Sequence, residues 1–324
     1  MGSANRCGIA VAGSILVDHI YDIAAYPGEG ELTQIRACRQ APGGCVPNVA
    51  IDLKRLSPQT PIYAMGLVGA DADGDYLRRT LQEGGVDVSG VKNTEGRTSF
   101  TDVMSVVGGQ RTFFTHAGAC ASFGTDSLDL ADSSAAMLHL GYFLLLDRID
   151  AGEGTEILKK AKELGIKTSI DLVSENSDRY KTVIPALAYT DNLIINELEA
   201  GKLAGIEPTM QNLQRICERL MEFGVAERVI LHMPSCGVCL SKNGFTVAAS
   251  FDPPKGYIKG KTGAGDAFCA GALLGIYQGR SDAEILDMAG AAATLSLSAP
   301  DATSGMCEME KALEFCGTMG RTQL

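Results

Sequence analysis

Apolar runs of strand length alternate with segments of helical periodicity along most of the chain. The runs typical of buried strands cover residues 7–17, 62–68, 136–146, 167–173, 192–196 and 228–233. Helical spacing of apolar residues covers residues 46–56, 73–83, 155–164, 212–223 and 267–277, with Asp73 as the expected N-cap of the second helix. Because strands and helices alternate, we predict an α/β fold with a mostly parallel sheet and helices on both of its faces.

Two segments interrupt this alternation. Residues 20–38 and 98–115 contain short stretches of alternating polar and apolar side chains, and Gly108-Gly109 joins two of them as in a hairpin. We expect an α/β body made of residues 1–13, 42–96 and 119–324, with a small inserted β-sheet lid made of residues 14–41 and 97–118. The lid could cover a ligand or form a homodimer through its exposed edge, and we expect the dimer. A peripheral hairpin on a monomer is the alternative.

The charge balance excludes some classes of partner. The chain has 28 Lys and Arg against 39 Asp and Glu, a formal net charge of −11. Proteins that bind a phosphate backbone cluster Lys and Arg, so we expect no nucleic-acid partner. The apolar stretch at residues 8–17 is too short to span a bilayer, so we expect no membrane association. Ten cysteines scattered over 324 residues are typical of reduced thiols and favour a cytoplasmic location.

A glycine-rich turn comes directly before the last predicted helix. Gly263, Ala264 and Gly265 leave backbone N–H groups exposed at the helix start, where the helix dipole attracts an anion. An ionised Asp266 in such a pocket would repel a phosphate ligand, but it could take a proton from an attacking hydroxyl group. Lys261 could contact the same anion, or it could be an ordinary exposed lysine.

Other interpretations of these residues fit less well. A Walker A loop ends in Gly-Lys-Thr, as residues 260–262 do, but Lys255 stands where its first glycine belongs. A dinucleotide-binding fingerprint needs a third glycine, and Phe268 stands there instead. An ordinary glycine-rich helix start remains possible.

The sequence assigns no residue as a direct metal ligand. His232, Cys236 and Cys239 are spaced as three ligands, but a structural zinc site usually needs four. Asp171 lies near the end of the strand predicted at residues 167–173, where it could lie near a bound phosphate or cap a helix.

Four elements together resemble the ribokinase-like (pfkB) carbohydrate kinases, and they occur in that family's order over nearly the whole chain. The family signature D-T-x-G-A-G-D-x-F is matched in register by residues 262–268, apart from its variable position. The Gly43-Gly44 pair is followed by Asn48 at a helix start, an early strand ends in Asp18, and an N-x-x-E element begins at Asn196.

The resemblance implies transfer of the γ-phosphoryl group of ATP to a hydroxymethyl group of a sugar or related polyol. In that case Asp266 is the general base, and the amides of Gly263, Ala264 and Gly265 stabilise the transferred group. The residues implied to hold the sugar are Asp18, Gly43, Gly44 and Asn48. Those implied on the ATP and Mg²⁺ side are Asn196, Glu199, Thr262, Gly237 and Lys261.

Three positions depart from the family pattern. Gly260 replaces an aspartate that helps relatives bind a monovalent cation, so activation by potassium is doubtful. Pro234 replaces the first glycine of a turn on the nucleotide side, and Cys120 stands where relatives often have asparagine. A sugar-sensing pseudokinase with an impaired nucleotide site is therefore an alternative, as is a nucleoside kinase of the same family.

Overall fold

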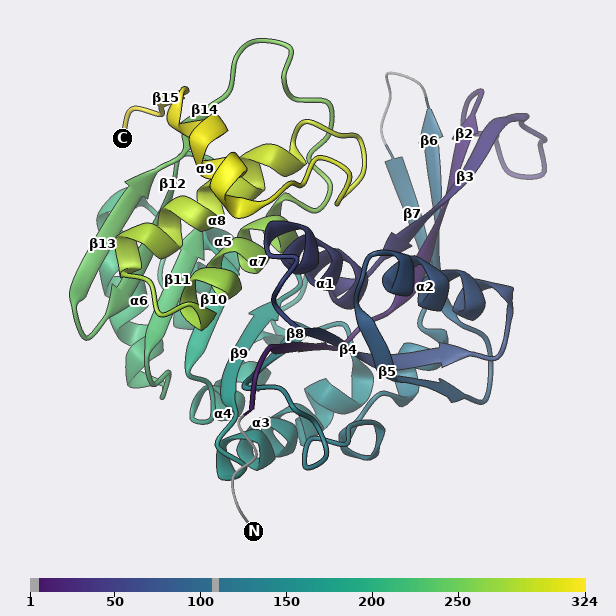
Figure 1. Cartoon of the computed structure of the whole chain (residues 1–324). Coiled ribbons are helices and arrows are strands. Elements are labelled where there is room, and N and C mark those ends of the chain that lie inside the picture. The colour runs from purple at the N-terminus through teal and green to yellow at the C-terminus, as the bar shows by residue number, and fades with distance from the viewer. Residues whose placement is uncertain (1–5, 107–110) are drawn as a thin grey trace.

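The computed structural model describes residues 6–106 and 111–324, arranged as a large α/β body and a small projecting sheet (Figure 1). The hairpin predicted at Gly108-Gly109 lies outside the described residues. The central sheet has nine strands in the order β13-β12-β11-β10-β9-β8-β1-β4-β5. All neighbours from β11 to β5 pair in parallel, and β12 and β13 add an antiparallel hairpin at one edge. The predicted fold class is thereby confirmed.

The strands of the central sheet are short and mostly buried. They are β1 (Ile9–Ala12), β4 (Ile62–Gly69), β5 (Asp87–Thr94), β8 (Met137–Phe143), β9 (Lys167–Leu172), β10 (Asn192–Asn196), β11 (Arg228–His232), β12 (Cys236–Ser241) and β13 (Gly244–Ala249). A separate two-stranded sheet joins β14 (Phe251–Asp252) to β15 (Gly320–Arg321).

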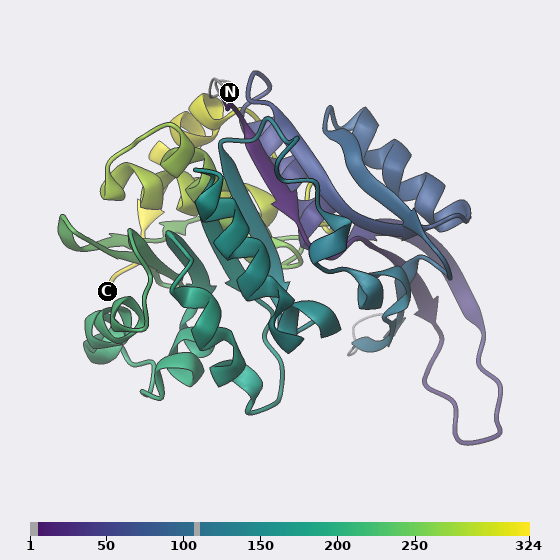
Figure 2. The same cartoon turned by 90° about the horizontal axis from the view of Figure 1, so that it is seen from below.

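Helices cover both faces of this sheet, as Figure 2 shows from below. One face carries α1 (Cys45–Leu56), α2 (Ala72–Glu83), α7 (Ala264–Tyr277), α8 (Asp282–Ser296) and α9 (Met309–Gly317). The other carries α3 (Gly154–Glu163), α4 (Ile184–Leu187), α5 (Glu197–Ala204) and α6 (Leu213–Glu222). Short 3-10 segments lie at Gly118–Ser122, Thr125–Ser127, Arg179–Val183 and Met210–Asn212, and a π-helical turn lies at Ile149–Glu153.

Strand β1 shows how two cores form around one sheet. Ile9 and Val11 belong to the core beneath α1 and α7, whereas Ala10 and Ala12 belong to the core on the opposite face. Successive side chains of a strand point to opposite faces, so a strand between two helical layers must be apolar at every position. Continuous apolar runs are therefore what the strands of this sheet require, and the parallel sheet predicted from the alternation of strands and helices is confirmed.

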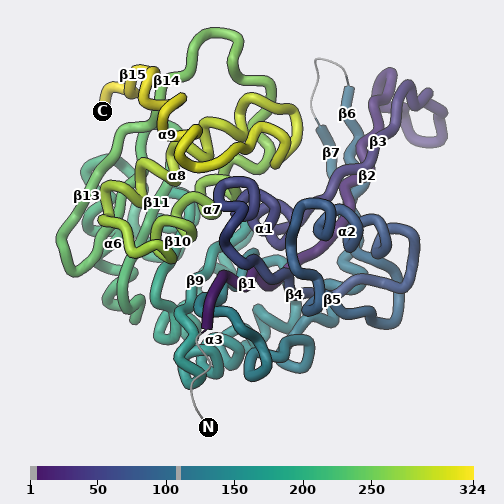
Figure 3. The backbone as a smooth tube through the Cα atoms, viewed as in Figure 1, coloured from purple at the N-terminus to yellow at the C-terminus, as the bar shows by residue number. Residues whose placement is uncertain are grey.

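The small sheet projects from the body beside α2 (Figures 1 and 3). Its strands are β3 (Ile35–Gly43), β2 (Leu16–Ile23), β6 (Ser99–Val106) and β7 (Arg111–His116), in the order β3-β2-β6-β7. The β2–β3 and β6–β7 pairs are antiparallel, while the central β2–β6 pair is parallel. Near the body, His19 of β2 contacts Asp73 of α2 at 3.5 Å and Asp102 of β6 at 3.1 Å.

Two local predictions were wrong. Residues 7–17 do not form one strand: β1 ends at Ala12, and the chain turns at Gly13, with φ of +140°, before β2 begins in the small sheet. The N-cap of α2 is Asp71, whose carboxylate accepts a hydrogen bond from Gly74 N at 2.9 Å. Asp73 lies inside the helix and contacts the small sheet instead, which the local sequence could not indicate.

Within residues 6–106 and 111–324, no helix combines the length and the apolar character needed to cross a membrane. All ten cysteines lie in these described ranges, and each is a free thiol.

Candidate active site

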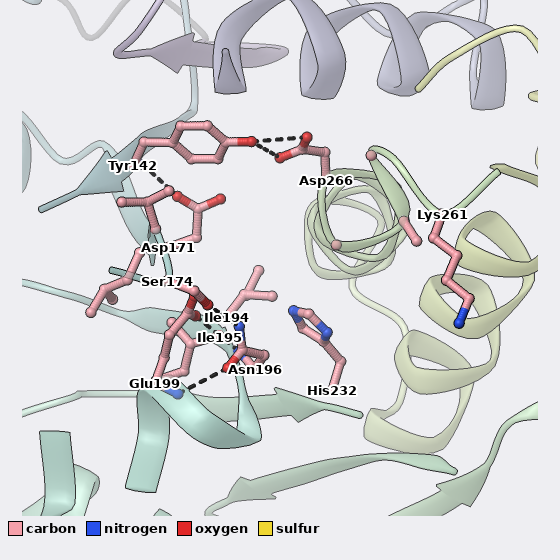
Figure 4. Close-up of a pocket in the computed structure, with 15 residues that line it drawn as sticks. Tyr142, Asp171, Ser174, Ile194, Ile195, Asn196, Glu199, His232, Lys261 and Asp266 are labelled. Atoms are coloured by element: carbon pink, nitrogen blue, oxygen red, sulfur yellow. Dashed lines mark hydrogen bonds between the residues drawn. The ribbon is translucent and has the colours of Figure 1, made fainter. Parts of the chain in front are cut away.

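A cavity of about 210 Å³ opens where the carboxyl ends of β8, β9, β10 and β11 meet the start of α7 (Figure 4). Ligands of parallel α/β sheets bind at this end of the strands, because the connecting loops diverge there. The cavity is lined by Tyr142, Asp171, Leu172, Val173, Ser174, Ile194, Ile195, Asn196, Glu199, His232, Lys261, Gly263, Ala264, Gly265 and Asp266. The structure therefore places the glycine-rich turn beside the N-x-x-E element, although 64 positions separate Asn196 from Gly260.

The start of α7 leaves backbone donors open. Gly263 is the N-cap in the left-handed region, with φ of +78°, and a Cβ there would lie 2.4 Å from Cβ of Ala302. A glycine is thus required, and it offers no side chain to cap the helix. The amide of Ala264 donates to Lys261 O at 3.4 Å, whereas those of Gly265 and Asp266 have no acceptor among the described residues. Such a helix start favours an anion.

Asp266 is 6% exposed at the rim of this turn. Its carboxylate accepts hydrogen bonds from Asn48 Nδ2 at 2.9 Å and from the Tyr142 hydroxyl at 2.9 and 3.0 Å. Burial, aided by the charge of Asp171, raises the pKa of Asp266 to about 7, although the two hydrogen bonds oppose the shift. A carboxylate with a pKa near neutrality is suited to act as a general base.

Tyr142 is one of the cavity residues that the sequence did not reveal. An aromatic side chain in an apolar strand indicates core packing, and no local pattern marks it otherwise. Its φ of +62° is rare for a residue with a side chain, and its amide donates to Asp171 Oδ1 at 2.6 Å. The strained backbone and the bond to Asp171 together direct the phenol toward Asp266 (Figure 4).

Asn196 and Glu199 form the capping box of α5. Asn196 Oδ1 accepts from Glu199 N at 2.9 Å, and Glu199 Oε2 accepts from Asn196 N at 3.1 Å. The Ser174 hydroxyl donates to Glu199 Oε1 at 2.6 Å. Burial raises the pKa of Glu199 to about 7. The motif thus has a structural role, and both side chains also line the cavity beside Asp171, where their carboxylate and amide oxygens are ligands of the kind that Mg²⁺ prefers.

Lys261 and His232 also line the cavity, and they differ in charge. Lys261 is the one lysine or arginine among the lining residues, and its ammonium extends away from Asp266 (Figure 4). His232 stacks on Phe268 with ring centroids 4.9 Å apart, and burial lowers the pKa of His232 to about 4. The imidazole is therefore uncharged at neutral pH.

Some residues singled out from the sequence lie outside the cavity lining. Gly237 is buried in β12, where a Cβ would lie 3.1 Å from Cζ of Phe268. Thr262 is exposed on the turn. Cys120 is buried, and its thiol donates to Ile15 O at 3.4 Å. Gly260 packs closely against the backbone of Ala299, since a Cβ on Gly260 would lie 2.7 Å from Ala299 O.

The four residues expected to bind the sugar lie where the small sheet joins the body, in β2, in β3 and at the start of α1. Asp18 lies against Gly43: a Cβ on Gly43 would be 2.8 Å from Asp18 Oδ2. Burial raises the pKa of Asp18 to about 6. Gly44 is the N-cap of α1, with φ of +86°. Asn48, in the first turns of α1, connects this region to the cavity through its hydrogen bond to Asp266.

A buried cluster with metal-binding side chains lies beneath the cavity. His139 Nε2 is 3.5 Å from Asp171 Oδ2 and 3.6 Å from Cys269 Sγ, and His139 Nδ1 is 3.0 Å from Ser169 Oγ. These donors suit a soft metal, but the same contacts form a hydrogen-bond network under Asp171. His232, Cys236 and Cys239 do not form such a cluster among the described residues.

Comparison with known proteins shows the family of the chain. The family model described as pfkB family carbohydrate kinase matches residues 8–309. A ribokinase of Arabidopsis thaliana is 24% identical over 95% of this chain and 80% of its own, and a fructokinase of Klebsiella pneumoniae is 27% identical over 83% and 84%.

Solved structures show the same fold. That of Arabidopsis thaliana ribokinase complexed with ribose and ATP has a TM-score of 0.81 at 23% identity, covering 96% of this chain and 99% of the other. The nucleoside kinase of Methanocaldococcus jannaschii has a TM-score of 0.77 at 18% identity, covering 97% and 99%.

The raised pKa of Asp266 predicts a pH-dependent loss of stability. Because this pKa rises from 3.8 to about 7 on folding, the folded protein holds the proton more tightly than the unfolded chain does. The resulting stabilisation is present at low pH and is lost as pH rises through about 7. Asp266→Asn removes the ionisation, so we expect its Tm to exceed that of the wild type by more at pH 8 than at pH 5.

Thermal unfolding at the two pH values tests this expectation. Asp252→Asn, at an exposed position of β14, is the matched control and should behave like the wild type. A Tm difference for Asp266→Asn that does not grow with pH would show that the carboxyl group is not destabilised by burial.

Proposed function

Since the chain belongs to the pfkB family of carbohydrate kinases, and is thus a phosphotransferase with an alcohol acceptor, we propose that it transfers the γ-phosphoryl group of ATP to a hydroxymethyl group of a sugar or related polyol. The observation that carries this proposal is the buried Asp266 carboxylate beside open amides at the start of α7. A proton acceptor and an anion site are the two groups that such a transfer needs.

Asp266 is the general base of the proposed reaction. Its pKa near 7 leaves a large ionised fraction at neutral pH and keeps the carboxylate basic enough to accept the hydroxymethyl proton. As the proton moves to Asp266, the alcohol oxygen bonds to the γ-phosphorus, and the bond from that phosphorus to the leaving oxygen of ADP breaks. Asn48, which donates to Asp266 Oδ2, keeps the carboxylate at the cavity.

The start of α7 is proposed to hold the transferred group. ATP, when bound with Mg²⁺, supplies the phosphoryl group and part of the charge neutralisation. The amides of Gly263, Ala264 and Gly265 would stabilise the charge on the moving group, and Lys261 and Thr262 would contact the nucleotide phosphates from the same turn. Gly237 would act through its packing against Phe268 rather than by direct contact.

Mg²⁺ fits the side of the cavity opposite this turn, which we call the acidic wall and which is formed by Asp171, Asn196 and Glu199. Asp171, Asn196 and Glu199 line the cavity together, and their oxygen atoms would hold the ion or its waters. Asn196 and Glu199 are fixed by their mutual hydrogen bonds, so little ordering would be needed when the ion binds.

The sugar is proposed to bind between the body and the small sheet. Asp18, Gly43, Gly44 and Asn48 would bond its hydroxyl groups, since carboxylate and amide groups supply both acceptors and donors. The small sheet, with the segments 14–41 and 97–118, would act as a lid that excludes water as a competing acceptor. Ribose is bound in the Arabidopsis ribokinase structure, which supports a pentose among the first candidates.

Removal of the base should abolish most turnover while sparing sugar binding. We expect Asp266→Asn to lower kcat by about 10²–10⁴-fold, because general-base assistance is typically of that size. ATP-dependent phosphorylation is measured by coupled ADP release, and sugar affinity by calorimetry. Asp252→Asn should match the wild type, and near-normal turnover of Asp266→Asn would exclude the assigned role.

A thermal-shift screen should identify the acceptor class. Pentoses, hexoses including fructose, keto-sugar acids and nucleosides are compared at equal concentration, since a ligand of the native state raises Tm. We expect a free sugar to raise Tm and then to serve as acceptor. A nucleoside that does so alone would favour the nucleoside kinase, and a sugar that binds without turnover would favour the sugar sensor.

The lid sheet is also the proposed dimer interface. Phe113 and Phe114 of edge strand β7 are 63% and 57% exposed, and an edge strand offers unpaired backbone groups to a second copy. We expect a dimer by light scattering and a shift toward monomer for Phe114→Glu. Ile258→Glu, at another exposed apolar position, is the control. A wild-type monomer would contradict the proposal.

A further inference from the structure

The base has a second hydrogen-bond donor whose role the proposed reaction leaves open. The Tyr142 hydroxyl lies 2.9 Å from Asp266 Oδ1 and 3.0 Å from Oδ2, so it bridges both oxygens, whereas Asn48 engages Oδ2 alone. Two donors on different elements, β8 and α1, fix the orientation of the carboxylate plane. Oδ1 keeps lone-pair capacity for an incoming alcohol, because a carboxylate has about four acceptor sites.

The backbone of Tyr142 is held in an unusual conformation. Its φ of +62° is unfavourable for a residue with a Cβ, and such strain persists only where surrounding contacts enforce it. The contact here is the 2.6 Å hydrogen bond from Tyr142 N to Asp171 Oδ1. Asp171 in turn has Oδ2 3.5 Å from the buried His139. The position of the phenol is thus set by a chain of polar contacts that runs away from the cavity.

Several titratable groups surround Asp266. Besides Asp171 of β9 and Tyr142 of β8, these are Asp52 and Cys45 of α1, Cys269 of α7, His232 of β11 and Lys261 of the glycine-rich turn. Burial raises the pKa of Asp52, Cys45 and Cys269 well above their usual values, and it lowers that of His232 to about 4. The two thiols and the imidazole are therefore uncharged near neutral pH, burial favours the protonated form of Asp52, and Asp171 provides the nearby negative charge.

We propose that Tyr142 is a positioning residue for the base: its hydroxyl, directed by the bond from its own amide to Asp171, holds the Asp266 carboxylate toward the acceptor and favours its ionised form. The proposal rests on the proposed function, because it assigns Tyr142 a role through Asp266. A donor to a carboxylate stabilises the ionised state, whereas the charge of Asp171 destabilises it. Tyr142 and Asp171 thus act on the same proton in opposite directions.

Removal of the hydroxyl should shift the proton affinity of Asp266. In Tyr142→Phe the phenyl ring keeps its place, but the carboxylate loses the donor that bridges its oxygens. We expect the acid limb of kcat/KM against pH to move up by about one pH unit, because hydrogen bonds to charged groups have energies of that order. The direct readout is the carboxyl titration of ligand-free protein labelled with [¹³C]aspartate, with Asp266→Asn to assign the signal.

A second variant should shift the Asp266 titration in the opposite direction. Asp171→Asn removes the negative charge, so the Asp266 titration should move down in pH, opposite to its movement in Tyr142→Phe. Tyr277→Phe is the matched control, because its hydroxyl accepts a hydrogen bond from Gly8 N at 2.8 Å, away from the cavity. We expect Tyr277→Phe to lower Tm without moving either pH profile.

The outcomes separate this proposal from the proposed function. An unmoved or downward-shifted titration of Asp266 in Tyr142→Phe would overturn the positioning role, even if activity falls. If Tyr142→Phe does not fold, Asp171→Asn decides instead. A titration of Asp266 that does not move, or that moves up in pH, in Asp171→Asn overturns the proposal. Full turnover by Asp266→Asn would defeat the proposed function, while the titrations in ligand-free protein would still report whether Tyr142 controls this carboxyl group.

Discussion

The hydrogen bonds that Asp266 accepts from Asn48 and Tyr142 join α7, α1 and the end of β8, three elements that are far apart in the sequence. The carboxylate they hold is almost fully buried, and a buried charge is unfavourable unless donors surround it. The position of each element at this corner of the sheet is therefore constrained by one group. A small displacement of α1 or β8 would remove a donor and leave the Asp266 carboxyl group either protonated or turned away from the cavity.

Close backbone packing around the glycine-rich turn adds a second constraint. Gly263 meets Ala302, and Gly260 meets Ala299, at distances where no Cβ fits without movement. The segment after α8 thus supports the turn from behind while the amides of Gly265 and Asp266 remain open in front. The packing at Gly260 also gives a physical meaning to the departure from the family pattern, because an aspartate there would require the segment at Ala299 to shift.

Polar side chains near the cavity combine structural and chemical roles. Asn196 and Glu199 cap α5 and line the acidic wall, and Asp171 both holds the amide of Tyr142 and raises the pKa of Asp266. These shared roles lower the entropy cost of binding, because a side chain already fixed by the fold needs no further ordering when it contacts a ligand. They also mean that substitutions at these positions change stability and chemistry together, so that pH profiles are more informative than loss of activity alone.

The fold class and the family could be predicted from patterns within short segments of the chain. Continuous apolar runs such as those of β1 and β10 can be buried only between two helical layers, and local motifs with strong backbone demands, such as residues 263–266, keep their spacing in any context. The N-x-x-E element is local in the same way, because Asn196 and Glu199, which form the capping box of α5, are three residues apart.

Which of these motifs meet, and which groups surround Asp266, depends on the tertiary structure. Gly141 and Cys45 approach Gly13 so closely that no Cβ fits there without movement, Asp71 rather than Asp73 caps α2, and Tyr142 reaches Asp266 across 124 positions of sequence. The pKa of Asp266 depends on burial and on Asp171, neither of which is local. Hydrophobic periodicity reports which face of an element is buried, but contacts between distant side chains depend on how the elements pack, and that information lies in no single segment.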